Sequence, residues 1–229
     1  MTIGFAAFSA ELSAECAPPV AGECDCNDKP PFVVFDTPVP DQGELSVLET
    51  RVHDSVIGVR LAAVQQLGRF KANVAVPVLI QALRDPSCRV AAAAAWSLRS
   101  TTDERTAAPL REALTHGGCL LRARAADALE SHNDAETSRV MIVALRDPDP
   151  RVRAPAARNL GEYHAMRAVM QLIAAMNDND KHVRQAAAES LGRLKDRRAL
   201  KVLTRALRDE NKEVRQSAAD AIGRIGSGS

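Results

Sequence analysis

Apolar residues recur along the chain with a period of 31 positions. Six anchor positions mark this period without any insertion: Asp54, Asp85, His116, Asp147, Asp178 and Asp209. An aliphatic residue stands five places after each anchor: Val59, Val90, Leu121, Val152, Val183 and Val214. Another stands thirteen places after it: Leu67, Leu98, Leu129, Leu160, Leu191 and Ile222. This spacing predicts six equivalent helices, each with one buried stripe.

A further apolar stretch precedes each later anchor and predicts a partner helix for each of these six. Alanine pairs at the ninth and tenth places after most anchors allow neighbouring helices to pack closely. A hairpin of two short helices cannot bury its own apolar faces, so the units must stack on one another. The pattern therefore predicts an all-α fold, a right-handed α-solenoid of about six two-helix units with a 31-residue period.

Local chemistry predicts where these helices begin and end. Asp85-Pro86 and Asp147-Pro148 are typical of a helix N-terminus, with the aspartate as N-cap and proline in the first turn. Glycine is common just after the end of a helix, and we expect it to end the second helix of four units, at Gly68, Gly161, Gly192 and Gly223. The first helices of three units have candidate N-caps at Asp103, Asp134 and Asp196.

The chain divides into three parts on this basis. Residues 44–225 form the array, with a weakly matching first helix at 44–53. Residues 1–43 form a leader that contains cysteine and many prolines, and residues 226–229 form a Gly/Ser tail. Proline at this density prevents a helix, and Phe32-Val33-Val34-Phe35 lies between prolines. We expect the leader to be partly extended and to dock on the first unit, since a terminal repeat exposes an apolar end.

Charge and composition narrow the class of protein. Lys and Arg number 30 against 29 for Asp and Glu, so the net charge of +1 gives no global attraction to nucleic acid. No apolar stretch is long enough to span a membrane, and the N-terminus lacks the basic residues of a secretory signal. We therefore expect a cytoplasmic protein. The five cysteines are an odd number spread along the chain, which favours reduced thiols.

The pattern Asp-Pro-x-x-x-Val-Arg-x-x-Ala-Ala-x-x-Leu-Gly resembles HEAT-like repeats of the phycobilisome-lyase type over about four fifths of the chain. It is also similar to consensus-built binding scaffolds, and the regular register leaves a natural or an engineered origin open. The resemblance implies a HEAT-like α-solenoid. Its members include bilin lyase subunits, adaptor modules and binding scaffolds, so it does not specify one function.

An arginine stands six places after five of the anchors: Arg60, Arg122, Arg153, Arg184 and Arg215. The resemblance implies that these arginines bind the anchor aspartates of the same or a neighbouring unit, forming a ladder of ion pairs. A row of phosphate-binding cations is the alternative interpretation. Ala91 replaces the arginine in the second unit and His116 replaces the aspartate in the third, so we expect the ladder to be interrupted there.

No catalytic motif or cofactor site is predicted. Cys16, Cys24 and Cys26 could supply three thiolates to zinc, but their spacing is unusual and no fourth ligand lies nearby, so we expect no metal. Cys88 and Cys119 occupy equivalent places in adjacent units, about 10 Å apart by helix packing, which is too far for a disulfide between them. No His-Glu pair of the kind found in the HEAT-like deoxyhypusine hydroxylases occurs, which excludes that enzyme.

The second helices are expected to line the concave face, where the exposed positions vary while the core positions do not. The predicted partner-binding residues are Trp96, Leu61, Gln65, Arg124, Asp127, Arg158, Glu189 and Arg193. A core that repeats from unit to unit, together with exposed positions that vary, favours a non-catalytic adaptor for another protein. A bilin lyase or chaperone-like subunit acting on a phycobiliprotein-like partner is the alternative. Nucleic-acid binding ranks third because the charges along this face are mixed.

Trp96 is the sharpest candidate, since it is the only tryptophan and stands where other units carry Gln65, Asp127, Arg158, Glu189 or Asp220. We expect it to be exposed in a shallow apolar patch and to act as an interface anchor. The alternative interpretation is that the ring packs against the leader or fills the space left by Ala91.

Overall fold

The computed structural model describes residues 42–70 and 72–227, in which it has 12 α-helices and no strand. The first helices of the units are α1 (Gln42–Arg51), α3 (Ala72–Ala82), α5 (Ala107–His116), α7 (Ala135–Ala144), α9 (Val169–Ala175) and α11 (Leu200–Ala206). The second helices are α2 (Ile57–Leu67), α4 (Cys88–Leu98), α6 (Cys119–Ala128), α8 (Pro150–Glu162), α10 (Lys181–Leu194) and α12 (Lys212–Gly226). Short 3-10 turns precede α5, α9 and α11 and follow α6.

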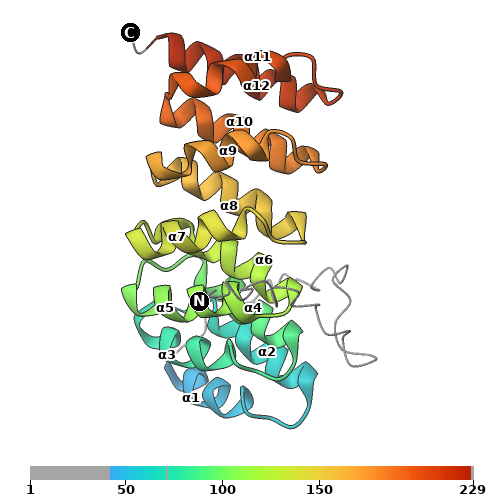
Figure 1. Ribbon diagram of the computed structural model, residues 1–229. Helices are drawn as coiled ribbons and strands as arrows, with labels where there is room; N and C mark the ends of the chain where they lie inside the picture. The colour runs from blue at the N-terminus through green and yellow to red at the C-terminus, as the bar shows by residue number, and fades with distance from the viewer. Residues whose placement is uncertain (1–41, 71, 228–229) are drawn as a thin grey trace, which may run out of the picture.

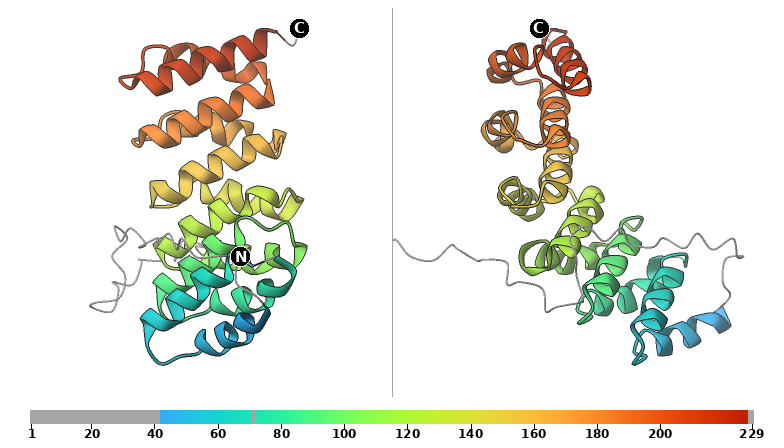
Figure 2. Two further views of the ribbon diagram at one scale, coloured as in Figure 1. Left: turned by 180° about the vertical axis from the view of Figure 1, so that it is seen from behind. Right: turned by 90° about the vertical axis from the view of Figure 1, so that its right-hand side faces the viewer.

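The two-helix units stack along one direction, from α1 and α2 at one end to α11 and α12 at the other (Figure 1). Each second helix packs on the second helix of the next unit, so these six helices form a continuous inner row. The stack bends near α6, and its N-terminal units run in a different direction from its C-terminal units (Figure 2). The predicted solenoid of two-helix repeats is confirmed.

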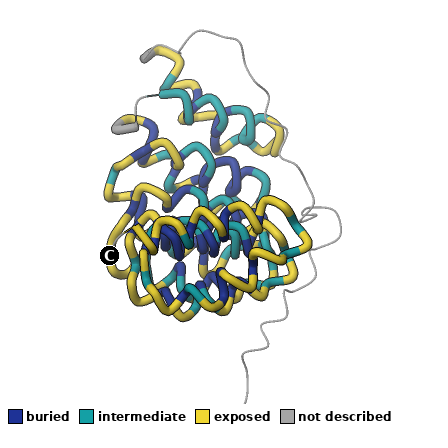
Figure 3. Tube along the Cα trace, turned by 90° about the horizontal axis from the view of Figure 1, so that it is seen from above, coloured by how far each residue is buried: buried dark blue, intermediate teal, exposed yellow. Residues whose placement is uncertain are grey.

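The core follows the 31-residue period. Leu67, Leu98, Leu129, Leu160 and Leu191 are all completely buried, as the thirteenth-place pattern predicts. Buried positions run through the middle of the stack and exposed positions along its outside (Figure 3). Burying a leucine side chain contributes about 2 kcal/mol, so this column is a main source of stability.

The anchor aspartates are not N-caps, which corrects the prediction from Asp85-Pro86 and Asp147-Pro148. α4 begins at Cys88 with Ser87 as its N-cap, and α8 begins at Pro150 with Asp149 as its N-cap. An anchor aspartate instead accepts a backbone hydrogen bond within the loop that leads into the second helix. Asp85, for example, accepts one from the Ser87 amide at 2.8 Å. The expected caps at Asp103, Asp134 and Asp196 are confirmed, because each accepts backbone hydrogen bonds at the start of its helix or 3-10 turn.

Glycine also has a different role from the predicted one. Gly68 does end α2, but Gly161, Gly192 and Gly223 lie inside α8, α10 and α12. A Cβ at Gly161 would lie 2.7 Å from the Ser190 Cα, and one at Gly192 would lie 2.8 Å from the Ala221 Cα. These two glycines therefore allow close contact between consecutive inner helices rather than helix termination.

The ion-pair ladder is confirmed for four of the five arginines, each of which binds the anchor of the next unit, whereas Arg215 of the last unit donates to the carbonyl oxygens of Asp209 and Glu210. Four rungs have Arg Nε to Asp Oδ2 distances of 2.7 to 2.8 Å: Arg60–Asp85, Arg122–Asp147, Arg153–Asp178 and Arg184–Asp209. Both exceptions fall on the same rung, since Ala91 would have to bind His116. The ladder is therefore broken once, between the second and third units. The phosphate-binding interpretation does not fit arginines that already hold aspartates in two hydrogen bonds each.

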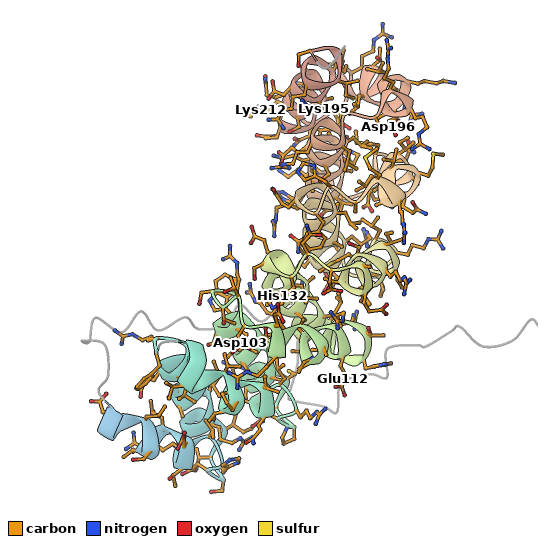
Figure 4. The ribbon with its side chains drawn as sticks, turned by 90° about the vertical axis from the view of Figure 1, so that its left-hand side faces the viewer. Asp103, Glu112, His132, Lys195, Asp196 and Lys212 are labelled. Carbon is orange, nitrogen blue, oxygen red and sulfur yellow. The ribbon has the colours of Figure 1, made fainter. Side chains whose placement is uncertain are left out.

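A buried polar contact joins the loop after α6 to the turn before α5. The His132 Nε2 atom lies 2.8 Å from the Thr106 Oγ1 atom, and both residues are buried. Asp103 lies beside them, and His132 and Asp103 mark this contact in Figure 4. The hydrogen bond satisfies both side chains, so this histidine has a structural role.

Residues 1–41 and 228–229 lie outside the described residues. The predicted docking of the leader on the first unit and the expectation that Cys16, Cys24 and Cys26 hold no metal are therefore untested by the structure. Among the described residues, no group of three or more potential ligands that could hold a metal ion is found. No helix of the described ranges is long and apolar enough to cross a membrane.

Candidate protein-binding face

The predicted binding residues lie on the inner row, on α2, α4, α6, α8 and α10, and all eight are partly buried. We call the surface that they share the inner face. Their positions at the seventh, eighth, eleventh and fifteenth places after the anchors fall on one side of each helix, away from the buried stripe. Side chains of this face also bind one another between units, so the face is partly organised before any partner arrives.

Trp96 is partly buried, which corrects the expectation that it is exposed. Two guanidinium groups cover its ring: the Cζ atom of Arg99 lies 5.2 Å from the ring centroid, and that of Arg124 lies 4.7 Å from it. Cation–π contacts at these distances are attractive and fix the ring orientation. The sequence pattern identified the outward position of Trp96 correctly but not the arginines that reach over it from the next turn and the next unit.

Arg124 lies at the centre of this cluster. Burial lowers the pKa of its guanidinium, and the like charges of Arg151 and Arg99 act in the same direction, although Asp127 opposes them. The Asp127 carboxylate binds Arg158 more closely, at 2.8 Å, than Arg124, at 3.9 Å. The inner face of α4, α6 and α8 therefore combines an aromatic ring with several guanidinium groups.

The remaining candidates belong to two separate groups. Glu189 accepts hydrogen bonds from Gln185 at 3.0 Å and Ser217 at 3.2 Å, and Arg193 pairs with Glu162 at 3.0 Å. Leu61 packs against the edge of the core. The structure therefore brings Trp96, Arg124, Asp127 and Arg158 together, and it places the other four candidates elsewhere along the same face.

Sequence reasoning missed Arg99, Arg151 and Glu130, although a signal for two of them was present. The fourteenth place after the anchor is glycine in four units, and Arg99 and Glu130 are the two exceptions. They occur in adjacent units and form an ion pair at 3.5 Å. Where a repeat departs from its consensus in two neighbouring units, the two side chains are candidates for direct contact.

Cys88 and Cys119 are both disulfide-bonded, so the prediction of reduced thiols is wrong for them. They are the first residues of α4 and α6, at the start of the two helices that carry Trp96 and Arg124. The prediction rested on the count of cysteines and on the distance between these two only. The cytoplasmic location stays a prediction.

The sequence matches the HEAT-repeat family over residues 45–130, 118–180 and 169–228. Together these segments cover most of the chain and nearly all of the helical array. The chain belongs to the HEAT-repeat family. The period of 31 residues, the stacked hairpins and the arginine–aspartate ladder are the features of this HEAT array that give the match its physical basis. No match was found among curated protein sequences.

Solved structures with the same fold support this assignment. An engineered protein is 21% identical, with a TM-score of 0.65, and the match covers 81% of this chain and 97% of that one. The complex of CpcE and CpcF of phycocyanin lyase from Nostoc sp. PCC7120 is 20% identical, with a TM-score of 0.63, covering 87% and 82%. A designed armadillo repeat protein in complex with the peptide (KR)4 is 16% identical, with a TM-score of 0.61, covering 80% and 99%. At these identities the likeness concerns the fold.

Proposed function

We propose that this HEAT-repeat protein is a non-catalytic scaffold that binds another protein through the inner face of its array. The observation that carries the proposal is the cluster of Trp96, Arg99, Arg124, Asp127 and Arg158 on three consecutive inner helices. The core and ladder residues repeat from unit to unit, whereas these side chains do not. A scaffold of this kind keeps folding and recognition on different residues.

The chemistry of the cluster suits a protein partner. Tryptophan and arginine are the residue types most often found as interface anchors, and the two guanidinium groups hold the ring in one orientation. A peptide chain offers backbone carbonyls and carboxylates to the arginines and apolar side chains to the ring. The designed armadillo protein in complex with the peptide (KR)4 is an example of a similar helical array that binds a peptide.

Affinity purification followed by mass spectrometry identifies the partner, and titration calorimetry then measures its dissociation constant. We expect Trp96→Ala to weaken binding by about 2 kcal/mol, or roughly 30-fold. Val143→Ala is the matched control, because Val143 is 71% exposed on a first helix and lies outside the inner face. Equal affinities of the Trp96→Ala variant and the unmodified protein would disprove a role for this cluster in binding.

A lyase or chaperone-like subunit acting on a phycobiliprotein-like partner is the second candidate. It is favoured by the extent of the match to the CpcE and CpcF complex, which covers more than four fifths of both chains. The test mixes the protein with a bilin and an apo-phycobiliprotein and records the absorbance of the denatured product. A coloured covalent adduct that forms only with this protein supports the lyase, and absence of colour supports the non-catalytic scaffold.

A further inference from the structure

The first helices leave grooves between consecutive units on the outer side of the stack. One open groove of about 440 Å³ lies between the C-terminal end of α7 and the side of α9. Its lining includes Arg146, Met170, Gln171, Ala174 and Asn177. Sites for small ligands usually have volumes of about 300 to 1,000 Å³, so this groove can hold one. It is formed by first helices and is therefore separate from the inner face (Figure 2).

Two equivalent grooves are bridged by a polar contact between units. Arg84, directly before the anchor of the second unit, pairs at 3.0 Å with Glu112, four places before the anchor of the third unit. The groove beside this pair is smaller, about 190 Å³. The same two places in the fifth and sixth units are Asn177 and Arg205, and the Arg205 guanidinium donates to the Asn177 side-chain oxygen.

The groove between the fourth and fifth units lacks this bridge. Arg146 occupies the place of Arg84, but Ala174 occupies the place of Glu112. Arg146 is exposed, and its guanidinium makes no ion pair within residues 42–70 and 72–227. Asp178 also lines the groove, but its carboxylate is already paired with Arg153 at 2.7 Å. The charge of Arg146 is therefore available for an anion from outside the array.

The wall beside Arg146 is apolar. Met170 is 56% exposed on α9, and the exposed Ala174 lies one helical turn further along the same side. A methionine side chain is flexible and adapts to the shape of an apolar ligand. From Met170 to Asn177 the wall spans about 10 Å, which is the length of three residues of extended peptide.

A hydrogen-bond acceptor in this groove also lacks a donor. The Gln171 Oε1 atom is buried and has no hydrogen-bond partner among the described residues. Leaving a buried carbonyl oxygen unpaired is costly, so a donor that reaches this amide is favoured. A peptide supplies such donors as its backbone N–H groups.

We propose that the groove between α7 and α9 binds a short extended peptide segment in which an acidic side chain lies next to an aliphatic one. The carboxylate binds the Arg146 guanidinium, and the aliphatic side chain contacts Met170 and Ala174. A backbone N–H of the segment donates to the Gln171 amide oxygen. This site is independent of the proposed inner-face function, so the array carries two docking surfaces of different chemistry.

Methyl NMR of the full-length protein, with its methionine methyl groups labelled with 13C, tests this site. Met170 lines the groove, whereas Met166 is exposed outside its lining and Met141 is completely buried. The probes are N-acetyl-Leu-Asp-Leu-amide and its neutral counterpart N-acetyl-Leu-Asn-Leu-amide. We expect the acidic peptide to shift the Met170 signal saturably, with a millimolar dissociation constant at least about threefold lower than that of the neutral peptide.

Arg146→Gln should remove the difference between the two peptides, whereas Arg84→Gln, at the equivalent place in the second unit, should preserve it. Trp96→Ala should leave the Met170 shifts unchanged, which separates this site from the proposed inner-face function. Absence of a Met170 shift at about 10 mM peptide, or equal constants for both peptides, overturns the proposal. Acetate that binds as tightly as the acidic peptide overturns it too, because the groove would then be a simple anion site.

Discussion

The second and third units differ from the three C-terminal units in how their inner helices pack. α8, α10 and α12 have 13, 14 and 15 residues and continue through Gly161, Gly192 and Gly223. α4 has 11 residues and ends at Leu98, directly before Arg99, and α6 has 10 residues and ends at Ala128, two positions before Glu130. Arg99 and Glu130 replace that glycine. The C-terminal units have every ladder rung between them, whereas the rung between the second and third units is missing.

This difference separates units that keep the consensus residues from units that have lost some of them. Where the consensus is kept, glycine and the arginine–aspartate pairs hold consecutive units close together. Where it is lost, long polar side chains take the vacated positions and turn toward the inner face, as Arg99 does at Trp96. Two neighbouring units that depart together from the consensus are therefore the place to look for recognition in an otherwise regular array.

We expect the largest loss of stability when a ladder rung between the C-terminal units is removed. Arg184 and Asp209 are 9% and 12% exposed, so Arg184→Ala leaves a largely buried carboxylate without its partner. We expect a loss of about 2 to 3 kcal/mol in the free energy of unfolding, measured by urea denaturation. Arg84→Ala removes an exposed pair with Glu112 and should cost less than about 1 kcal/mol. Similar losses in both variants would contradict a structural role for the ladder.

Two glycines of the C-terminal units, Gly161 and Gly223, allow a matched pair of substitutions. Gly161→Ala places a Cβ against the backbone of Ser190 and should lower the free energy of unfolding by about 1 to 2 kcal/mol. Gly223→Ala meets no atom within 4 Å, so the better helix propensity of alanine should stabilise the protein by up to about 1 kcal/mol. The same denaturation series measures both, and stabilisation by Gly161→Ala would show that the inner helices do not need the close contact.

Restoring the missing rung between the second and third units should produce a smaller change, a gain in stability. Ala91→Arg together with His116→Asp installs the missing rung between the second and third units, and we expect about 1 kcal/mol of added stability. Ala91→Arg alone should destabilise, because Ala91 is only 2% exposed and the new cation lacks its aspartate. The interaction energy follows from a double-mutant cycle, and additive effects of the two substitutions would mean that no rung has formed.

Sequence reasoning predicted the period, the stacked hairpins and the ladder because these depend on residues that recur at fixed spacing. It assigned the wrong role to Gly161 and Gly192, because the sequence alone does not show the next helix that makes glycine necessary. It placed Trp96 on the correct face but missed its burial, which depends on arginines from two different helices. The disulfides of Cys88 and Cys119 were missed because the number and spacing of cysteines do not show which thiols the fold brings together.

The pH dependence of stability gives the smallest expected difference between the two regions. The hydrogen bond from Arg184 holds the pKa of Asp209 below its usual range, more strongly than burial raises it. A lowered pKa in the folded state contributes stability above the unfolded value of about 3.9, and this contribution is lost as the pH falls through the folded pKa. The boundary of the second and third units has no such carboxylate, because His116 replaces the aspartate. Hydrogen exchange measured between pH 5 and pH 2.5, after correction for the intrinsic exchange rate, should therefore show protection falling more steeply in α10 and α12 than in α4 and α6, by less than about 1 kcal/mol.

Asp209→Asn is the control, since it removes the titrating group and should flatten the profile of α10 and α12. Parallel profiles of the two regions in the unmodified protein would mean that the ladder does not govern acid sensitivity.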